Sequence, residues 1–153
     1  MTSQPRFTTA PAFTVVGLLL HTRPMSPEIS ALWDRFVPRM GEIQHQSEQH
    51  VSYGLMGHFD QTTGMFDYMA GSAVTQVAQL PSGMTRWDVS ANTYAVLETV
   101  LPKIGETMDY LYTTWLPLSE YQPVDAPSFE RYGEAFSPEN PVVEIFVQVK
   151  NKL

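Results

Sequence analysis

Residues 141–150, Pro-Val-Val-Glu-Ile-Phe-Val-Gln-Val-Lys, form the strand candidate from which the rest of the chain is interpreted. Its odd-numbered positions from 143 to 149 are all Val or Ile, whereas Glu144, Phe146 and Gln148 lie between them. This period of two is typical of a strand with one face in a core. Glu144 is then either a solvated surface residue or the charged floor of a pocket, and the function depends on which of the two holds.

Length and composition restrict the class of protein. The chain has 153 residues, of which 43% are hydrophobic, so it is long and apolar enough for one domain with a sizeable core. A net charge of −7 without a basic run argues against a nucleic-acid partner, because phosphate binding depends on clustered Lys and Arg. The absence of Cys excludes disulfides and thiolate metal sites. No signal-peptide pattern or membrane-spanning apolar run is present, so we expect a cytoplasmic protein without membrane contact.

Apolar periodicity and Pro or Gly breaks predict the order of the elements. Ser26 is a good helix cap and Pro27 is typical of a first helical turn, while Pro117 predicts the end of a second helix. The range 84–100 reads as one long strand, bent near residue 91. In full, we expect a loose lead-in over 1–11, strands over 13–22, 51–60, 65–76, 84–100, 129–136 and 142–150, and helices over 26–40 and 102–116.

The order strand, helix, strand, strand thus occurs twice, and one spacing relates the two copies. A shift of 79 residues takes Thr14 to Thr93, Leu18 to Leu97, 36–38 to 115–117, and Tyr53-Gly54 to Tyr132-Gly133. We interpret this as an internal duplication within a single domain 1–153, with half-repeats of about 12–78 and 84–150.

Two such units predict an α+β fold with pseudo-twofold symmetry. Their strands would join into one antiparallel sheet with both helices on one face. Under the same shift, Met65 and Asp67 correspond to Glu144 and Phe146. We therefore expect the helix-free faces of these strands to lie around a central ligand cleft.

Several segments, taken in order, resemble the GyrI-like effector-binding domain. This is the ligand-sensing domain of AraC- and MerR-type multidrug regulators, which also occurs alone, and the chain looks particularly like the stand-alone, integron-cassette-type members. The matching segments are Leu32-Trp33-x-x-Phe36, 53–54, 67–71, 94–96, Trp115-Leu116-Pro117-x-Ser119-x-Tyr121, Phe129-Glu130-x-Tyr132 and 143–150.

The resemblance implies an aromatic cleft between the two halves that binds lipophilic cations. It also implies a buried acidic residue on the final strand, in the position of Glu144. Phe146 and Gln148 stand where many relatives have Tyr and Pro, so a tyrosine hydroxyl at position 146 is absent here.

Glu144 is the principal ligand-binding candidate. A carboxylate in an apolar pocket is costly unless it is paired, so an organic cation is a natural partner, and aromatic faces add cation–π attraction. The alternative for Glu144 is an exposed strand position, and the alternative for the other candidates is core packing. Those other candidates are Trp33, Phe36, Tyr68, Tyr112, Trp115, Phe146 and Met65.

Three more acidic residues are secondary candidates. Glu98 and Asp67 are better explained as solvated or paired structural groups, whereas Glu130 matches the Phe-Glu-x-Tyr motif but would serve equally to orient a loop. The four His residues lack metal-ligand spacing, and no nucleophile elbow or phosphate loop is present. We expect no metal, no cofactor and no assigned catalytic residue.

Three functions remain open. The first is a stand-alone sensor or sequestering module for cationic, lipophilic small molecules, with no direct nucleic-acid partner. The second is a hydrolase of reactive electrophilic compounds, with Glu144 and either Glu98 or Glu130 as general acid and base. The third is an inhibitor of a protein partner, whose acidic surface imitates nucleic acid. A homodimer is among the alternatives for the assembly.

Overall fold

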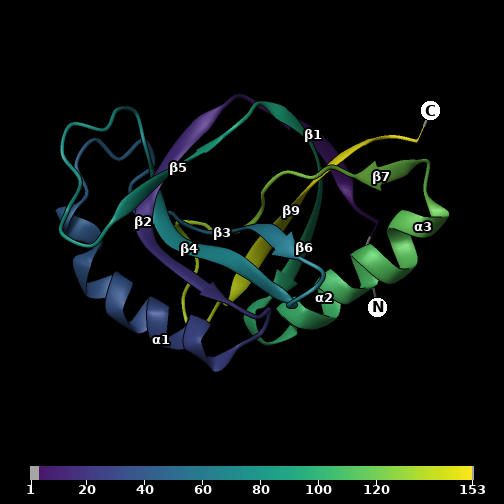
Figure 1. Cartoon of the computed structure of the whole chain (residues 1–153), viewed down its shortest axis with the longest axis horizontal. Coiled ribbons are helices and arrows are strands. Elements are labelled where there is room, and N and C mark those ends of the chain that lie inside the picture. Colours follow the sequence, from purple (N-terminus) through teal and green to yellow (C-terminus); the bar gives the residue numbers. More distant parts are fainter. Residues whose placement is uncertain (1–3, 153) are drawn as a thin grey trace.

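Residues 4–152 are the part of the chain that the computed structural model describes, so residues 1–3 of the predicted lead-in and residue 153 lie outside it. This part contains one nine-stranded antiparallel sheet (Figure 1). The strands are β1 (Arg6–Ala10), β2 (Phe13–Thr22), β3 (Ser52–Asp60), β4 (Met65–Val74), β5 (Thr85–Val89), β6 (Asn92–Val100), β7 (Tyr121–Pro123), β8 (Ser128–Tyr132) and β9 (Val142–Asn151).

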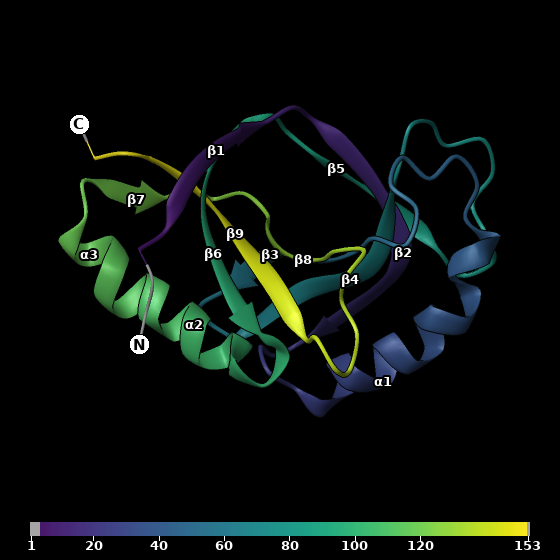
Figure 2. The same cartoon turned by 180° about the vertical axis from the view of Figure 1, so that it is seen from behind.

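The sheet is strongly curved, and its strand order explains why. The order is β1-β6-β9-β8-β3-β4-β2-β5, with β7 added along β9. Two residues join β1 to β2 and two join β5 to β6, yet each connection runs from one end of the sheet to the other. Because so short a link spans only about 10 Å, the two ends must lie close together. Figures 1 and 2 show these connections side by side over the top of the arch.

Two helical segments cover the convex side of the sheet (Figure 2). The first is α1 (Pro27–Phe36), which begins with Ser26 Oγ accepting a 3.1 Å hydrogen bond from the amide of Glu28 and continues as a 3₁₀ turn over Val37–Glu42. The second, residues 101–118, joins a 3₁₀ turn (Leu101–Lys103), α2 (Ile104–Tyr110), a π-helical turn (Leu111–Trp115) and α3 (Leu116–Leu118). No helix within 4–152 is long and apolar enough to cross a membrane.

The core is divided by the sheet. Leu32 and Phe36 of α1 pack on β2 and β4, and Leu111 and Leu116 of the second helical segment pack on β6 and β9. The concave side encloses a third cluster, rich in aromatic side chains, in which Phe129 is central. Both helices therefore lie on one face, as predicted, and the α+β class is confirmed.

Several element boundaries differ from the prediction, among them the strand predicted over 129–136, which ends at Tyr132. The lead-in contains β1, which pairs with β6, and 84–100 is split into β5 and β6 because these two strands pair at opposite ends of the sheet. The second helix continues past Pro117 to Leu118. Proline has no backbone N–H, and it is tolerated in the first turn of α3 because an N–H there would have no partner within that helix. The preceding π-helical turn lets a new α-helical turn begin at Leu116.

The repeated element order is present, but residues 79 positions apart do not occupy equivalent positions in the strand pairing of the two halves. From the outside inwards, the halves read β2-β4-β3 and β6-β9-β8. Leu18 pairs with Ala70, whereas Leu97 pairs with Ile145 and not with Val149, which follows Ala70 by 79 positions. Pseudo-twofold symmetry at the level of residues stays a prediction, as do the half-repeat boundaries.

Candidate functional site

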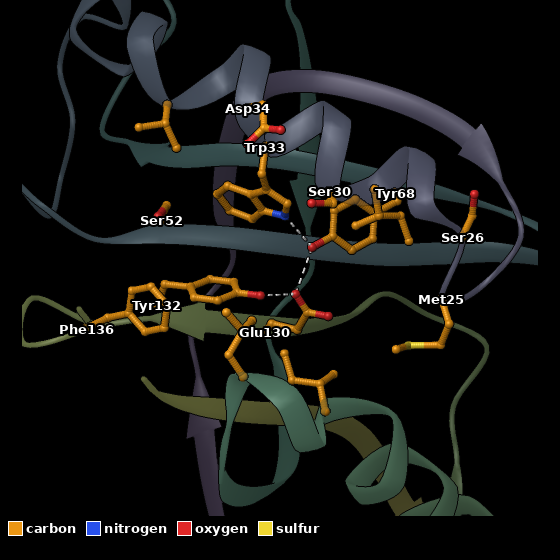
Figure 3. Close-up of a pocket in the computed structure, with 14 residues that line it drawn as sticks. Met25, Ser26, Ser30, Trp33, Asp34, Ser52, Tyr68, Glu130, Tyr132 and Phe136 are labelled. Atoms are coloured by element: carbon orange, nitrogen blue, oxygen red, sulfur yellow. Dashed lines mark hydrogen bonds between the residues drawn. The ribbon is translucent and has the colours of Figure 1, made fainter. Parts of the chain in front are cut away.

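A pocket of about 610 Å³ lies on the helix-covered face of the sheet, between α1 and the helical segment 101–118 (Figure 3). Its volume is within the range of small-molecule sites. Most of its lining is apolar or aromatic. The lining residues are Met25, Ser26, Ile29, Ser30, Trp33, Asp34, Val37, Ser52, Tyr68, Leu101, Ile104, Glu130, Tyr132 and Phe136.

Helical and strand periodicity together bring these side chains to the pocket. Residues 29, 33 and 37 are spaced by four, so they form one stripe along α1 and the first residue of the 3₁₀ turn after it. Leu32 and Phe36 point into the core. On β8, Glu130 and Tyr132 are two residues apart and share a face. Tyr68 of β4 completes the floor.

Glu130 is the buried carboxylate of the pocket. The residue is 7% exposed, and one of its oxygens, Oε1, accepts hydrogen bonds of 2.7 Å from both the Tyr68 and the Tyr132 hydroxyls. The indole Nε1 of Trp33 donates in turn to the Tyr68 oxygen, at 2.9 Å, and Figure 3 shows this chain. None of the ion pairs found within residues 4–152 includes Glu130.

The environment of Glu130 opposes its ionisation. Burial raises the pKa of the Glu130 carboxyl, and the hydrogen bonds from Tyr132 and Tyr68 offset only part of this effect. Burial and the adjacent carboxylate likewise raise the pKa of the Tyr132 hydroxyl, so this tyrosine stays a hydrogen-bond donor. A cation in the pocket would favour the charged form of Glu130, because it would supply the ion-pair partner that Glu130 lacks within residues 4–152.

Gly54 allows this arrangement. It lies on β3 directly opposite Glu130 of β8. A Cβ atom at position 54 would overlap the Tyr68 hydroxyl and lie 2.6 Å from Oε1 of Glu130. Any residue larger than glycine would therefore disturb the carboxylate and its hydrogen-bond donor.

Glu144 lies on the opposite face of the sheet, which corrects its predicted position in the pocket. Glu130 is paired across the strands with Ile145, so these two share the helix-covered face, whereas Glu144 is paired with Arg131 on the other face. The Glu144 carboxylate accepts hydrogen bonds from Arg131 at 3.2 Å and from Arg6 at 2.5 Å. Its charge is thus already compensated by two guanidinium groups.

The other predicted site residues divide into two groups. Trp33 and Tyr68 line the pocket, as expected. The remaining five lie elsewhere. Phe36 is buried beneath Trp33, and Tyr112 is 39% exposed with its hydroxyl 3.3 Å from Ser128 Oγ. Trp115 packs on Phe7 and Tyr121, Phe146 stacks on Phe129 at 4.6 Å, and Met65 pairs with Asp60 at the start of β4.

The helix-free face, where we expected the cleft, has a smaller cavity of about 330 Å³. Phe146 lines it together with Arg131 and Glu48, and the last two form an ion pair of 2.6 Å. Arg6 also lines this cavity and is paired with Glu144. Among its described lining residues, Glu48 is the carboxylate, and it is already in an ion pair. The larger cavity lies on the helix-covered face, between the two helices rather than beneath bare strands.

The secondary acidic candidates lie outside the pocket lining. Asp67 accepts hydrogen bonds of 2.8 Å from Nδ1 of both His21 and His58, which lowers the pKa of its carboxyl against the effect of burial. Glu98 is exposed on β6. These positions agree with the structural roles that the sequence indicated for both.

Glu130 was only a secondary candidate from the sequence, and Tyr132 and Phe136 were not predicted as site residues. The usable signal was the Glu-x-Tyr spacing within a strand, which places a carboxylate and a phenol side by side. Met25 and Leu101 carried no comparable signal, since their approach to the pocket depends on how two distant helices pack.

In the part of the chain that the structure describes, the buried carboxylate of this apolar pocket belongs to no ion pair, an arrangement typical of a small-molecule site. Residues 3–150 match the family model of the GyrI-like small molecule binding domain, and the chain belongs to this family, which confirms the resemblance. The transcriptional regulator BrlR of Pseudomonas aeruginosa is 35% identical over 133 residues, which are 86% of this chain and 48% of that protein. The chain thus spans about half the length of this relative.

Solved structures share the fold. SAV2435, solved bound to tetraphenylphosphonium, has a TM-score of 0.75 at 18% identity, covering 97% of this chain and 94% of that one. An integron cassette protein from the mobile metagenome of Vibrio cholerae has a TM-score of 0.66 at 20% identity, covering 97% of each chain. At these identities the likeness concerns the fold alone.

Proposed function

We propose that this chain binds lipophilic organic cations in the pocket between α1 and the helical segment 101–118, with Glu130 as the counter-charge. The observation that carries this proposal is the burial of Glu130 without a cationic partner in the described chain. A structural relative solved with tetraphenylphosphonium supports the same ligand class. The sequence suggested Glu144 as the residue that pairs with the cation, but Glu144 is already in ion pairs with two arginines. We therefore assign this role to Glu130.

The pocket walls suit a large, delocalised cation. The rings of Trp33 and Tyr132 meet edge to face with centroids 5.0 Å apart, and Phe136 packs against Tyr132 at 5.1 Å. Such rings offer apolar area and negative π faces, and a cation–π contact contributes about 0.5–1 kcal/mol when exposed and about 2 kcal/mol when desolvated. Charge recognition by Glu130 then selects cations among molecules of similar shape.

The biological role that we propose is that of a cytoplasmic sensor or sequestering module. The similarity to a transcriptional regulator favours a sensor, although this chain matches only about half of that protein. Protection of cells from a toxic cation, with no change in transcription, would instead favour sequestration. The homodimer stays a prediction, which sedimentation velocity of the whole chain would test.

A matched pair of ligands tests the proposal. Tetraphenylphosphonium and the neutral triphenylphosphine oxide present similar phenyl groups, and Trp33 in the wall gives a fluorescence signal for both. Glu130→Gln should weaken binding of the cation by more than about tenfold and change binding of the neutral compound by less than about twofold. Glu98→Gln removes an exposed strand carboxylate and should change neither. An equal loss of both ligands in Glu130→Gln would refute Glu130 as the counter-charge.

Hydrolysis of an electrophilic compound is the second candidate function, because Glu130 has two features of a general acid. Burial raises the pKa of its carboxyl, and it lies within hydrogen-bond distance of two tyrosine hydroxyls. Turnover of strained-ring or ester substrates that is lost in Glu130→Gln would establish this activity. A lack of turnover across a broad substrate panel would leave binding as the function.

A further inference from the structure

Asp34 is the second carboxylate in the pocket wall. It follows Trp33 on α1 and lies four residues after Ser30, which also lines the pocket. Unlike Glu130, it is exposed to solvent. Among the ion pairs found within residues 4–152, none includes Asp34.

The charges around the pocket are therefore of one sign. Of the residues that line it, Glu130 and Asp34 carry the charged side chains, and the lining includes no Lys, Arg or His. The two carboxylates lie at different depths, since Glu130 is 7% exposed while Asp34 is open to solvent. Figure 3 shows them on opposite sides of the hydrogen-bonded pair formed by Trp33 and Tyr68.

The surface between the carboxylates is apolar. Ile29 and Trp33 of α1 line the pocket beside Asp34, and the ring of Tyr132 packs edge to face against the ring of Trp33. A ligand that reaches both carboxylates must therefore have an apolar middle part, because a polar chain would lose its hydration along these walls.

We propose that the pocket selects elongated dications, whose two charged heads are joined by an apolar spacer. One head lies at Glu130 on the floor, the spacer runs along Trp33, and the second head lies at Asp34 on the rim. This inference rests on the proposed function and adds Asp34 as the residue that distinguishes dications from monocations. The cavity of about 610 Å³ holds more than a single compact head group.

The contribution of Asp34 is expected to be small but specific. An exposed ion pair changes affinity by roughly two- to fivefold, far less than a buried one. It is also screened by salt, since the Debye length falls from about 10 Å at 0.1 M to about 3 Å at 1 M ionic strength. A preference for dications that depends on Asp34 should therefore weaken as salt is added, whereas recognition of a monocation by Glu130 should change less.

The test compares 1,10-bis(trimethylammonium)decane with decyltrimethylammonium by calorimetry. A dication gains a factor of two merely because either head can enter, so the informative quantity is the ratio of the two affinities in each variant. Asp34→Asn should lower this ratio by roughly two- to fivefold, because the affinity for the dication falls more than the affinity for the monocation. Across spacers of four to twelve carbons, the wild-type protein should show an optimum length that Asp34→Asn lacks.

Asp109→Asn is the matched control. Asp109 is an exposed residue of α2 outside the pocket lining, so its replacement removes the same charge without touching the site. An unchanged ratio in Asp109→Asn and a lowered ratio in Asp34→Asn support the proposal. Melting temperatures of both variants should match the wild type, because neither carboxylate is in an ion pair found in the described residues.

Two failures of the test are distinguishable. An affinity ratio that is the same in Asp34→Asn and wild type, while Glu130→Gln weakens binding of the monocation by more than about tenfold, would overturn the role of Asp34 alone. Unaltered monocation binding in Glu130→Gln would overturn the proposed function itself, whatever the effect of Asp34→Asn.

Discussion

The hydroxyl of Tyr132 lies 2.7 Å from Oε1 of Glu130, two residues earlier on the same strand. Tyr68 donates to the same oxygen from β4, so the carboxylate is held from two sides. No hydrogen bond within the described chain reaches the second oxygen, Oε2, which leaves it for a ligand. The two tyrosines thus fix the position of the Glu130 carboxyl without supplying a positive charge beside it.

Loss of the Tyr132 hydroxyl should make Glu130 harder to ionise. In Tyr132→Phe the pKa of the Glu130 carboxyl should rise further, because a hydrogen bond that favours the charged form is removed. Cation binding near neutral pH should weaken by roughly 1 kcal/mol. A ¹³C NMR titration of the side-chain carboxyl measures the shift, and Tyr110→Phe, outside the pocket, is the control. A lowered pKa in Tyr132→Phe would be inconsistent with the geometry.

Glu130 should reduce stability at high pH. Because its pKa is raised in the folded protein, the neutral form is the one that folding favours. The stability that it contributes is complete below its unfolded pKa and is lost as pH rises through its folded pKa. Glu130→Gln should therefore be more stable than wild type above that folded pKa, by about 1–2 kcal/mol, and similar to wild type at low pH. Urea unfolding across pH checks this, and a parallel pH profile for the two proteins would contradict it.

Binding of a permanent cation should become tighter as pH rises. The cation favours ionised Glu130, so affinity should increase as pH rises through the pKa of Glu130 in the free protein and then level off. Below that pKa, binding must release a proton from the carboxyl. Calorimetry in buffers of different ionisation enthalpy measures this release, which Glu130→Gln should lack. Proton uptake on binding would have the wrong sign.

A methyl group at position 54 should displace the Tyr68 hydroxyl and the Glu130 carboxylate from their positions in the pocket. In Gly54→Ala the new Cβ overlaps the Tyr68 hydroxyl and crowds Glu130, so we expect a loss of about 1–3 kcal/mol in stability together with weaker cation binding. Gly41→Ala is the matched control, since its Cβ would have no heavy atom within 4 Å. The control should stay within about 0.5 kcal/mol of wild type. Equal behaviour of the two variants, by thermal unfolding and ligand titration, would argue against the close packing at Gly54.

The concave face should affect stability and not binding. Arg131 joins Glu144 and Glu48 there, with side-chain exposures of 28%, 23% and 37%. Glu144→Gln should lower the free energy of unfolding by about 1 kcal/mol, since the ion pairs are partly solvated. Chemical denaturation at two salt concentrations tests this, because the loss should be smaller at high salt.

Sequence patterns predicted most of the fold because they report local preferences. The Ser26 cap, the strand 13–22 and the hairpin around residues 60–64 all depend on short-range signals, and each is found where expected. The split of 84–100 was not predictable from alternation, since it reflects pairing at opposite ends of the strand order. The β1 strand was missed for the same reason.

The site was predicted less completely, because alternation distinguishes two faces of a strand without saying which one borders a pocket. On β9 the valines face the helices, so Glu144 must face away from them. On β9 the odd-numbered residues face the helices, whereas on β8 the even-numbered residues do. Glu130 therefore faces the helices, as the cross-strand partner of Ile145. Only the register between these two strands determines which carboxylate enters the pocket. The predicted positions of Tyr112 and Trp115 in the pocket were also wrong, because both side chains point away from the cavity on their helical segment.

The most direct test of the central claim compares two carboxylates that are separated by the thickness of the sheet. The dissociation constant of tetraphenylphosphonium should be measured for Glu130→Gln and Glu144→Gln under identical conditions. If Glu130 is the counter-charge, its replacement should raise the constant more than about tenfold, whereas Glu144→Gln should leave it within about twofold of wild type. The reverse order, with the larger loss in Glu144→Gln, would contradict the assignment of Glu130 as the residue that binds the cation.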